Sequence, residues 1–496
     1  MDLLSGLNPD SEVPLYRQLT DSIRNLILSG RLAPGEKLPA TRELAGMLKV
    51  NRTTVSAAYA LLEKEGLIAG HVGRGSFVTG GHYPLPAGGL DWDEVFPLHE
   101  GLAAPPVVSG SGDGELISFA TSRPSEQLFP LEAFRQTCRE VVESDGVAGI
   151  LQLGSPCGYE PLRQYLLDEA RRGGVARASD DILITNGCQQ AMDLLERTLA
   201  RPGDTVILED PVYPGLKNIF SRSGARLLGV QVGQEGMDVE ALERLLPAER
   251  PRLVVVTPDF QNPTGTTLPP EARKSILKKV RAAGTVLIEN DIYGHLRYDG
   301  SPFPRIKQLD EFGDTVYLGS FSKVAFPGLR VGWIIGPKPL IGRLAEAKQS
   351  SDLHTDQLSQ AIMLRFAQSG RLAAHLEHVV AAGAESLASA LEACEKHLPP
   401  GSYHTRPKGG MNMWLRLPEP LDAGELLPRA HRENVSYLPG RYFAVSHRDP
   451  GGLRLSFGGL SPAKIREGIA ILGRIFSEEL QETQARRRYA PALAMV

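Results

Sequence analysis

The chain has 496 residues and a formal net charge of −4, and 42% of its residues are hydrophobic. This length suits about three domains, or about two where one is a large α/β enzyme fold, and the composition is ordinary for a soluble globular protein. The start of the chain lacks a basic segment followed by an apolar run, and no stretch of about 18 apolar residues occurs. We therefore expect no signal peptide and no membrane span. The four cysteines lack metal-ligand spacing, so we expect no metal site and a cytoplasmic location.

The first eighty residues predict three short helices and a two-stranded wing. VPLYRQLTDSIRNLILSG (13–30) has apolar residues at helical spacing, and ATRELAGMLKV (40–50) predicts a second helix capped by Thr41. After a break at Val50-Asn51, RTTVSAAYALLEKEG (52–66) predicts the third helix. LIAGHVGRGSFV (67–78) alternates apolar residues about a glycine-rich tip, as a wing does.

Two helices joined by a short break form a helix-turn-helix, whose second helix places its first residues against base edges in the major groove. Arg52 suits guanine, and the threonines that follow it suit phosphates. The wing tip suits the minor groove. The side chains expected to contact DNA are Arg42, Arg52, Thr53, Thr54, His71, Gly73 and Arg74. The segment has nine basic and eight acidic residues, so charge alone does not indicate DNA, and a helix-turn-helix can also be a plain packing unit.

The run LAPGEKLPATRELAGMLKVNRTTV resembles the winged helix-turn-helix of GntR-type transcription regulators. The resemblance extends through residues 13–68 and implies operator DNA as a partner. Ser56 stands where some relatives carry a second recognition arginine, so a base preference cannot be transferred.

Residues 81–115 are rich in Gly, Pro and Ser and predict a linker between two domains, 1–80 and 116–480. Beyond the linker, short Val/Ile/Leu runs alternate with helical patterns, which predicts an α/β fold with a mainly parallel sheet. The runs are 181–185, 204–210, 252–258, 285–290 and 315–320. Residues 481–496 are expected to be a frayed tail.

A lysine follows the last of these strands in GSFSKVAFPGLRVGW (319–333). Alone, Lys323 is best explained as a lysine that reaches solvent from a surface turn. Two hydroxyls and a guanidinium bracket it, however, and that set suits a phosphate dianion. The residues are Ser320, Ser322 and Arg330. TNGCQQAMDLL (185–195) adds a helix start, where backbone N–H groups bind phosphate. An amine beside a phosphate cradle predicts a Schiff base from Lys323 to pyridoxal phosphate.

Further motifs supply the rest of such a site. Tyr213 in DPVYPG suits stacking on a pyridine ring, while Asn262 in PDFQNPTG and Tyr293 in ENDIYG suit its hydroxyl. Arg454 in GGLRLSFGG offers a fixed partner for a carboxylate. Each motif alone is weak, since NPTG can be only a turn and Arg454 only a structural ion pair.

Together and in this order, the motifs resemble those of fold-type I aminotransferases across about residues 116–475. The resemblance implies a large domain, a smaller C-terminal α+β subdomain, and pyridoxal phosphate as cofactor. It also assigns Cys188 and Gln189 to the phosphate, beside the serines and Arg330. A GntR-type head fused to such a body is the layout of the MocR subfamily of regulators.

Two positions depart from the family pattern. Most relatives hold the pyridine nitrogen with an aspartate three residues before the tyrosine, where this chain has Asn290. Asp291 stands two before Tyr293, a spacing that other relatives use, and strand neighbours point to opposite faces. Which of the two faces the ring stays open here. Leu153 replaces a tyrosine that in relatives reaches the partner subunit's cofactor.

Three functional interpretations follow. The first is a PLP-dependent transcription regulator that senses an amino acid, an amine or PLP itself through aldimine formation at Lys323, with Arg454 holding a carboxylate. The resemblance implies a homodimer, with room for a domain-swapped arrangement. The second is an active aminotransferase with a DNA-binding appendage. The third, a cofactor-binding scaffold without a DNA role, is disfavoured by the Arg52-Thr53-Thr54 run.

Overall fold

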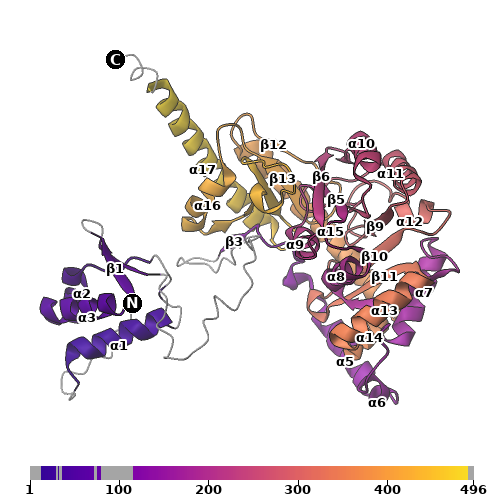
Figure 1. The fold of residues 1–496 in the computed structure, drawn as a ribbon, viewed down its shortest axis with the longest axis horizontal. Helices are drawn as coiled ribbons and strands as arrows, with labels where there is room; N and C mark the ends of the chain where they lie inside the picture. Colours follow the sequence, from indigo (N-terminus) through magenta and orange to yellow (C-terminus); the bar gives the residue numbers. More distant parts are fainter. Residues whose placement is uncertain (1–12, 29–31, 33–35, 72–74, 80–115, 490–496) are drawn as a thin grey trace. The chain divides into compact units, whose positions relative to one another are not determined.

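The computed structural model describes residues 13–28, 32, 36–71, 75–79 and 116–489. The chain divides into two compact units, Met1–Gly101 and Leu102–Val496, which are described separately as the head and the body (Figure 1). The expected linker, 81–115, and two wing-tip residues, Gly73 and Arg74, lie outside the described residues.

The head has the three helices and the wing that the sequence predicts. Its elements are α1 (Leu15–Leu28), α2 (Thr41–Leu48), α3 (Arg52–Lys64), β1 (Ile68–His71) and β2 (Gly75–Val78). The wing strands are antiparallel, with Ile68 opposite Val78. The helices pack through side chains that repeat at helical spacing, including the fully buried Leu19, Val55 and Leu62.

The turn between α2 and α3 is built from two local features. Lys49 ends α2 in the left-handed conformation, with φ 53°, and Asn51 caps α3 by accepting a hydrogen bond from the Thr53 N–H at 3.1 Å. The expectation that Thr41 caps α2 was wrong. Thr41 is the first helical residue, and Ala40 occupies the cap position without a side-chain hydrogen bond.

The body is built on an eight-stranded sheet with the order β4-β11-β10-β9-β8-β5-β6-β7. All five predicted strands are present, with ends that differ by two residues or fewer. The strands are β4 (Asp180–Asn186), β5 (Thr205–Asp210), β6 (Arg226–Gly233), β7 (Gly236–Met237), β8 (Leu253–Val256), β9 (Val286–Asn290), β10 (Val316–Ser320) and β11 (Val331–Pro337). Pairs β5–β6, β5–β8, β8–β9 and β9–β10 are parallel, whereas β11 runs antiparallel to both of its neighbours.

Helices cover both faces of this sheet, which explains why its strands are apolar on both sides. In β8, Leu253 and Val255 pack with α8 (Gly187–Leu199), α9 (Pro214–Arg222) and α13 (Lys338–Asp352). Val254 and Val256 pack with α10 (Val239–Glu249) and α11 (Pro270–Ala282). The other helices of this part of the body are α5 (Leu131–Val142), α6 (Val147–Ile150), α7 (Glu160–Arg172), α12 (Ile306–Leu309) and α14 (Gln357–Gln368).

A smaller α+β subdomain follows, as expected. Its four-stranded antiparallel sheet has the order β12-β13-β16-β15, and β14 pairs with β3 from the start of the body. Its elements are β3 (Ile117–Ser118), α15 (Arg371–His397), β12 (Tyr403–His404), β13 (Asn412–Arg416), α16 (Ala423–Arg432), β14 (Val435–Ser436), β15 (Leu438–Pro439), β16 (Gly452–Ser456) and α17 (Pro462–Tyr489). Because α17 continues to Tyr489, residues 481–489 of the expected tail are helical.

Within the described residues, no helix combines the length and apolar character that crossing a membrane requires. In the same residues, no three His, Cys, Asp or Glu side chains gather as metal ligands would.

The sheet determines where functional side chains meet. Strands β5, β8, β9 and β10 are parallel, so their carboxyl ends lie at one edge. The end of β4 reaches the same edge, because Asn186 pairs with Val331 at the start of β11. Ligands of open α/β sheets bind at this edge.

Candidate functional site

A cavity of about 580 Å³ lies at this edge of the body. Every residue predicted for the cofactor or for a carboxylate lines it, except Asp291. The lining members of that set are Cys188, Gln189, Tyr213, Asn262, Asn290, Tyr293, Ser320, Ser322, Lys323, Arg330 and Arg454. Residues more than 260 positions apart in the sequence therefore share one cavity.

Part of the cavity lining is a cradle of hydroxyl and guanidinium groups. Ser320 Oγ donates to Ser322 Oγ at 3.0 Å and accepts from the Ser322 N–H at 3.0 Å. Arg330 Nη2 donates to Asn186 O at 3.1 Å, directly before α8. Cys188 and Gln189 lie in the first turn of α8, where backbone N–H groups lack partners within the helix. These donors suit a phosphate.

Gly187 leaves room for this cradle. Its φ is +77°, and a Cβ at this position would lie 2.4 Å from Arg330 Nη2. Burial raises the pKa of the Cys188 thiol to about 12. The thiol therefore stays neutral near pH 7, and Cys188 contributes to the cradle through its main chain.

Lys323 lines the cavity from the turn after β10. Its Nζ donates to Ser122 O at 2.7 Å and lies 5.8 Å from the centre of the Tyr293 ring. Burial acts to raise the pKa of Tyr293, but Lys323, Ser122 and Arg454 outweigh burial and lower it. Asn262 Nδ2 donates to the Tyr293 hydroxyl at 3.3 Å.

Asn290 and Asp291 point to different surroundings. Asn290 lines the cavity, where its Nδ2 donates to Thr257 Oγ1 at 3.3 Å and its buried Oδ1 has no hydrogen-bond partner among the described residues. Asp291 instead accepts hydrogen bonds from Arg305 Nε at 2.7 Å and the Tyr317 hydroxyl at 2.8 Å. Burial acts to raise the pKa of Asp291, but Arg305 and the other partners lower it overall.

A second buried carboxyl group contacts the same threonine, Thr257, as Asn290 does. Glu209, at the end of β5, accepts the Thr257 N–H at 3.2 Å through Oε2, and its Oε1 has no partner. Burial raises the pKa of Glu209 to about 8, so this carboxyl group is protonated at neutral pH. Glu209 therefore adds no full negative charge to the surroundings of Asn290.

Arg454 lies on β16 and is 4% exposed. Its Nη1 donates to Asn262 Oδ1 at 3.0 Å, its Nη2 donates to Ala120 O, and its Nε is buried without a partner. No carboxylate pairs with Arg454 among the described residues, and burial lowers its pKa to about 10. A buried guanidinium without a counter-charge is costly, and a carboxylate ligand would offset this cost.

These features fit pyridoxal phosphate. The cradle suits its phosphate, Lys323 offers an amine for its aldehyde, and unpartnered buried atoms of Asn290 and Arg454 lie in the same cavity. The sequence interpretation missed Ser122, Thr257 and Glu209. Thr257 and Glu209 each end a buried apolar run, which was the available signal.

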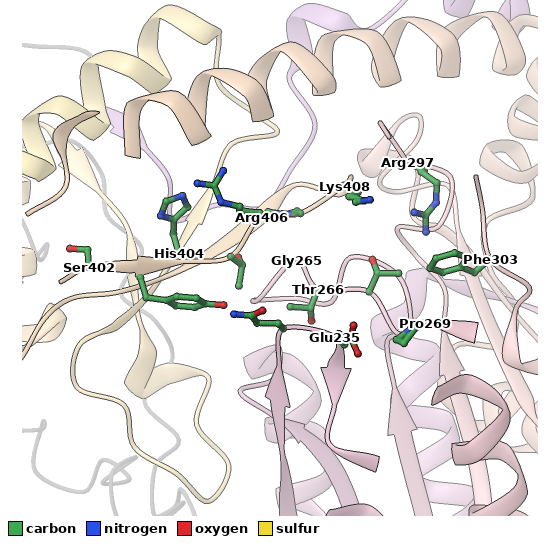
Figure 2. A pocket seen from close by; sticks show the side chains of 15 residues that line it. Glu235, Gly265, Thr266, Pro269, Arg297, Phe303, Ser402, His404, Arg406 and Lys408 are labelled. Carbon is green, nitrogen blue, oxygen red and sulfur yellow. The ribbon is translucent and has the colours of Figure 1, made fainter. Parts of the chain in front are cut away.

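Another cavity of about 580 Å³ lies between the turn before β7, the loop 265–269 and residues 402–408 (Figure 2). It contains none of the predicted cofactor residues. Its cations already have acidic partners, since Arg297 pairs with Asp259, Arg406 with Glu395 and Lys408 with Asp299. The Lys323 cavity is therefore the candidate site.

In the head, the predicted DNA contacts lie on or near the recognition helix. Arg42, Arg52 and Thr53 are exposed, and Thr54 is half-buried. Neither arginine forms an ion pair with another described residue of the chain. His71 ends β1, but its side chain is outside what the structure describes.

The fold and the site define a fold-type I protein that binds pyridoxal phosphate. Residues 116–472 match the family described as aminotransferase class I and II, and residues 15–78 match the bacterial regulatory proteins of the gntR family. The chain belongs to the aminotransferase class I and II family, and it joins this domain to a GntR-type head.

Relatives of two kinds resemble the chain. The uncharacterised HTH-type transcriptional regulator YdfD of Bacillus subtilis is 32% identical over 94% of this chain and 97% of its own length. The probable rhizopine catabolism regulatory protein MocR of Rhizobium meliloti is 29% identical over 95% of each chain. A crystal structure of LysN, an α-aminoadipate aminotransferase from Thermus thermophilus complexed with N-(5'-phosphopyridoxyl)-L-leucine, is 35% identical. It covers 79% of this chain and 100% of its own, with a TM-score of 0.71.

Proposed function

We propose that this protein is a PLP-dependent transcription regulator of the MocR type, in which the head binds operator DNA and the body binds an amine-bearing effector. The observation that carries the proposal is the presence in one chain of a recognition helix with exposed first residues and of a cavity lined by both Lys323 and Arg454. Regulators similar over nearly the whole chain support the same conclusion.

Each part of the cavity has its own task in this proposal. Pyridoxal phosphate supplies an aldehyde that reacts with amines, and Lys323 supplies the resident amine. The cradle of Ser320, Ser322, Arg330 and the start of α8 binds the phosphate. Asn262 and Tyr293 would hold the ring hydroxyl, Tyr213 would stack on the ring, and Asn290 would face the ring nitrogen.

The effector is an amino acid, an amine or the cofactor itself. Arg454 binds the carboxylate of an amino-acid effector, because among the described residues its buried Nε has no hydrogen-bond partner and its charge has no carboxylate partner. Binding changes DNA affinity to the extent that the effector favours one of two arrangements of the protein.

The proposal includes a homodimer acting in the cytoplasm, where operator DNA is found. Leu151 and Leu153 are 71% and 73% exposed in the single chain. Exposed leucines that neighbour each other suit burial by a partner subunit. The 81–115 segment gives the head enough chain to reach the partner's body in a domain-swapped dimer.

An active aminotransferase is the second candidate, favoured by the complete lysine site and by the similarity to LysN. Asn290 weighs against it, because an amide stabilises a protonated pyridine nitrogen less than a carboxylate does.

Operator binding tests the proposal directly. In fluorescence anisotropy with the chain's own upstream DNA at fixed salt, we expect specific binding that shifts when PLP or an amine is added. Replacing Arg52 with alanine is expected to weaken specific binding by about tenfold or more, because a bidentate arginine contact contributes about 1–3 kcal/mol. Lys323→Ala is expected to keep DNA binding and lose its response to amines. Absence of specific binding in every ligand state would favour the aminotransferase.

The phosphate cradle has its own test. Replacing Gly187 with alanine is expected to weaken PLP affinity by about tenfold, because the added Cβ displaces Arg330 and the backbone conformation is strained. Equilibrium dialysis measures the affinity. Gly203→Ala is the matched control, since Gly203 has φ +85° but open space around its missing Cβ. Equal PLP affinity in both variants would contradict the position assigned to the phosphate.

A further inference from the structure

A loop of the small subdomain, residues 442–447, is fastened to the large subdomain by a buried carboxylate. Asp210, at the end of β5, accepts the backbone N–H groups of Val445, Ser446 and His447 at 3.0, 2.9 and 2.9 Å. Gly229 on the neighbouring strand makes room for it, because a Cβ there would lie 2.6 Å from Asp210 Oδ2. The cavity-side end of β5 thus contains a preformed acceptor for three successive N–H groups.

The carbonyl groups of the same loop are fastened as well. Lys217 on α9 donates from Nζ to Tyr442 O at 3.2 Å and to Ala444 O at 2.9 Å. Between them, Phe443 O accepts the Val212 N–H at 2.9 Å. Six successive residues of the loop therefore each give one backbone group to β5, α9 or the turn that joins them.

This attachment fixes Phe443, which is fully buried. Its ring centre lies 5.1 Å from the Arg454 guanidinium carbon and 5.7 Å from the Trp414 ring, edge to face. An aromatic ring at this distance orients a guanidinium and keeps water away from it. Within the described residues, Arg454 donates hydrogen bonds from two of its three nitrogens, so the ring contributes to its orientation.

We propose that Asp210 and Lys217 are positioning residues of the effector's carboxylate subsite, because they hold Phe443 against Arg454. The inference rests on the proposed role of Arg454 and adds the residues that make this arginine selective for carboxylates. Neither Asp210 nor Lys217 lines the cavity around Lys323, so both act through the loop.

Chemistry favours a carboxylate at position 210. Three N–H donors converge on two charged oxygens, and hydrogen bonds to a charged acceptor are about twice as strong as neutral ones. In Asp210→Asn, the amide nitrogen would face N–H groups that are themselves donors. The loop would lose at least one of its three bonds, and Phe443 would move relative to Arg454.

The test compares amine ligands that differ only in the carboxylate. Cofactor-loaded full-length protein is titrated with the common amino acids that have a primary amine and a single carboxylate, and with the amine formed from each by decarboxylation. The absorbance of the bound cofactor reports binding. For Asp210→Asn, we expect affinity for the amino acids to fall by about tenfold or more. Affinity for the matching amines and for PLP should change by less than about twofold.

Lys217→Met provides a second variant, and the same selective loss is expected for it. Asp238→Asn is the matched control, because Asp238 also accepts two backbone N–H bonds, both at 2.9 Å, but at the start of α10. If the Asp210 and Lys217 variants lose affinity equally for amino acids, amines and PLP, both residues have a general structural role and the positioning role is wrong.

Arg454→Lys separates failure of this inference from failure of the proposed function. If Arg454→Lys abolishes the preference for amino acids but the Asp210 and Lys217 variants keep it, the positioning role is wrong and the role of Arg454 stands. If Arg454→Lys keeps the preference, or the wild type binds no amino acid, the carboxylate subsite itself is wrong.

Discussion

Replacing Asn290 with aspartate is expected to speed transfer of an amino group from an amino acid to the cofactor-loaded protein by about ten- to thousandfold. An opposite charge nearby shifts the pKa of an ionisable group by about 1–3 units, so the new carboxylate would raise the pKa of the ring nitrogen by that amount. Each unit corresponds to a factor of ten. Asn290 lines the cavity with a buried Oδ1 that has no partner, so the substituted carboxylate would occupy the same place. Greater protonation of the ring nitrogen makes the cofactor a better electron acceptor.

Single-turnover absorbance measures the transfer, and a pH titration of the cofactor's absorbance in the absence of substrate reports the ring nitrogen independently. Asp291→Asn is the matched control. Because Asp291 bonds Arg305 and Tyr317 instead of facing the cavity, its replacement should lower stability more than it changes the pH titration. An unchanged titration in Asn290→Asp would show that Asn290 does not contact the ring nitrogen.

The free energy of unfolding of the wild type is expected to fall as pH rises, and replacing Glu209 with glutamine is expected to abolish this fall. The folded-state pKa of Glu209 is raised by burial from 4.5 to about 8. Between these values the folded protein holds a proton that the unfolded chain has released, so the free energy of unfolding falls as pH increases. The loss is complete above the folded-state pKa and amounts to on the order of 3–5 kcal/mol.

Urea unfolding of the wild type and Glu209→Gln at pH 5, 6.5 and 8 measures this effect. The free energy of unfolding of the variant, relative to that of the wild type, should increase with each step in pH. Glu271→Gln serves as a control, because the Glu271 side chain is 83% exposed and pairs only at the surface. A difference between wild type and Glu209→Gln that does not vary with pH would mean that Glu209 is ionised in the folded protein.

Periodicity and motif order were enough to predict the main strands, the helix-turn-helix and the gathering of Lys323, Arg330 and Arg454. The strands and the helices of the head follow local rules, such as apolar runs for buried strands. The gathering of the three site residues was instead implied by the resemblance to the aminotransferase family. The choice between Asn290 and Asp291 could not be made in this way. It depends on which face of β9 meets the cavity and on Arg305 and Tyr317, which occupy the other side.

Several of the residues missed by sequence reasoning contact backbone groups or act through their own. Asp210 and Lys217 bind N–H and C=O groups of a loop more than 220 residues away, and no side-chain pattern marks those partners. Ser122 contributes to the Lys323 environment through its carbonyl oxygen, a group that every residue possesses. Such contacts follow from the path of the chain and become visible only when that path is known.

The pairing of β4 with β11 has a consequence for the order of folding. Asn186 and Val331 are neighbours in the sheet but lie 145 positions apart in the chain, as their residue numbers give. Closing so long a loop is entropically costly and slow compared with forming local contacts. The two halves of the phosphate cradle, Gly187-Cys188 and Arg330, flank this pair. On a ribosome, the nascent chain therefore cannot assemble its cofactor cradle until two thirds of the protein has been synthesised.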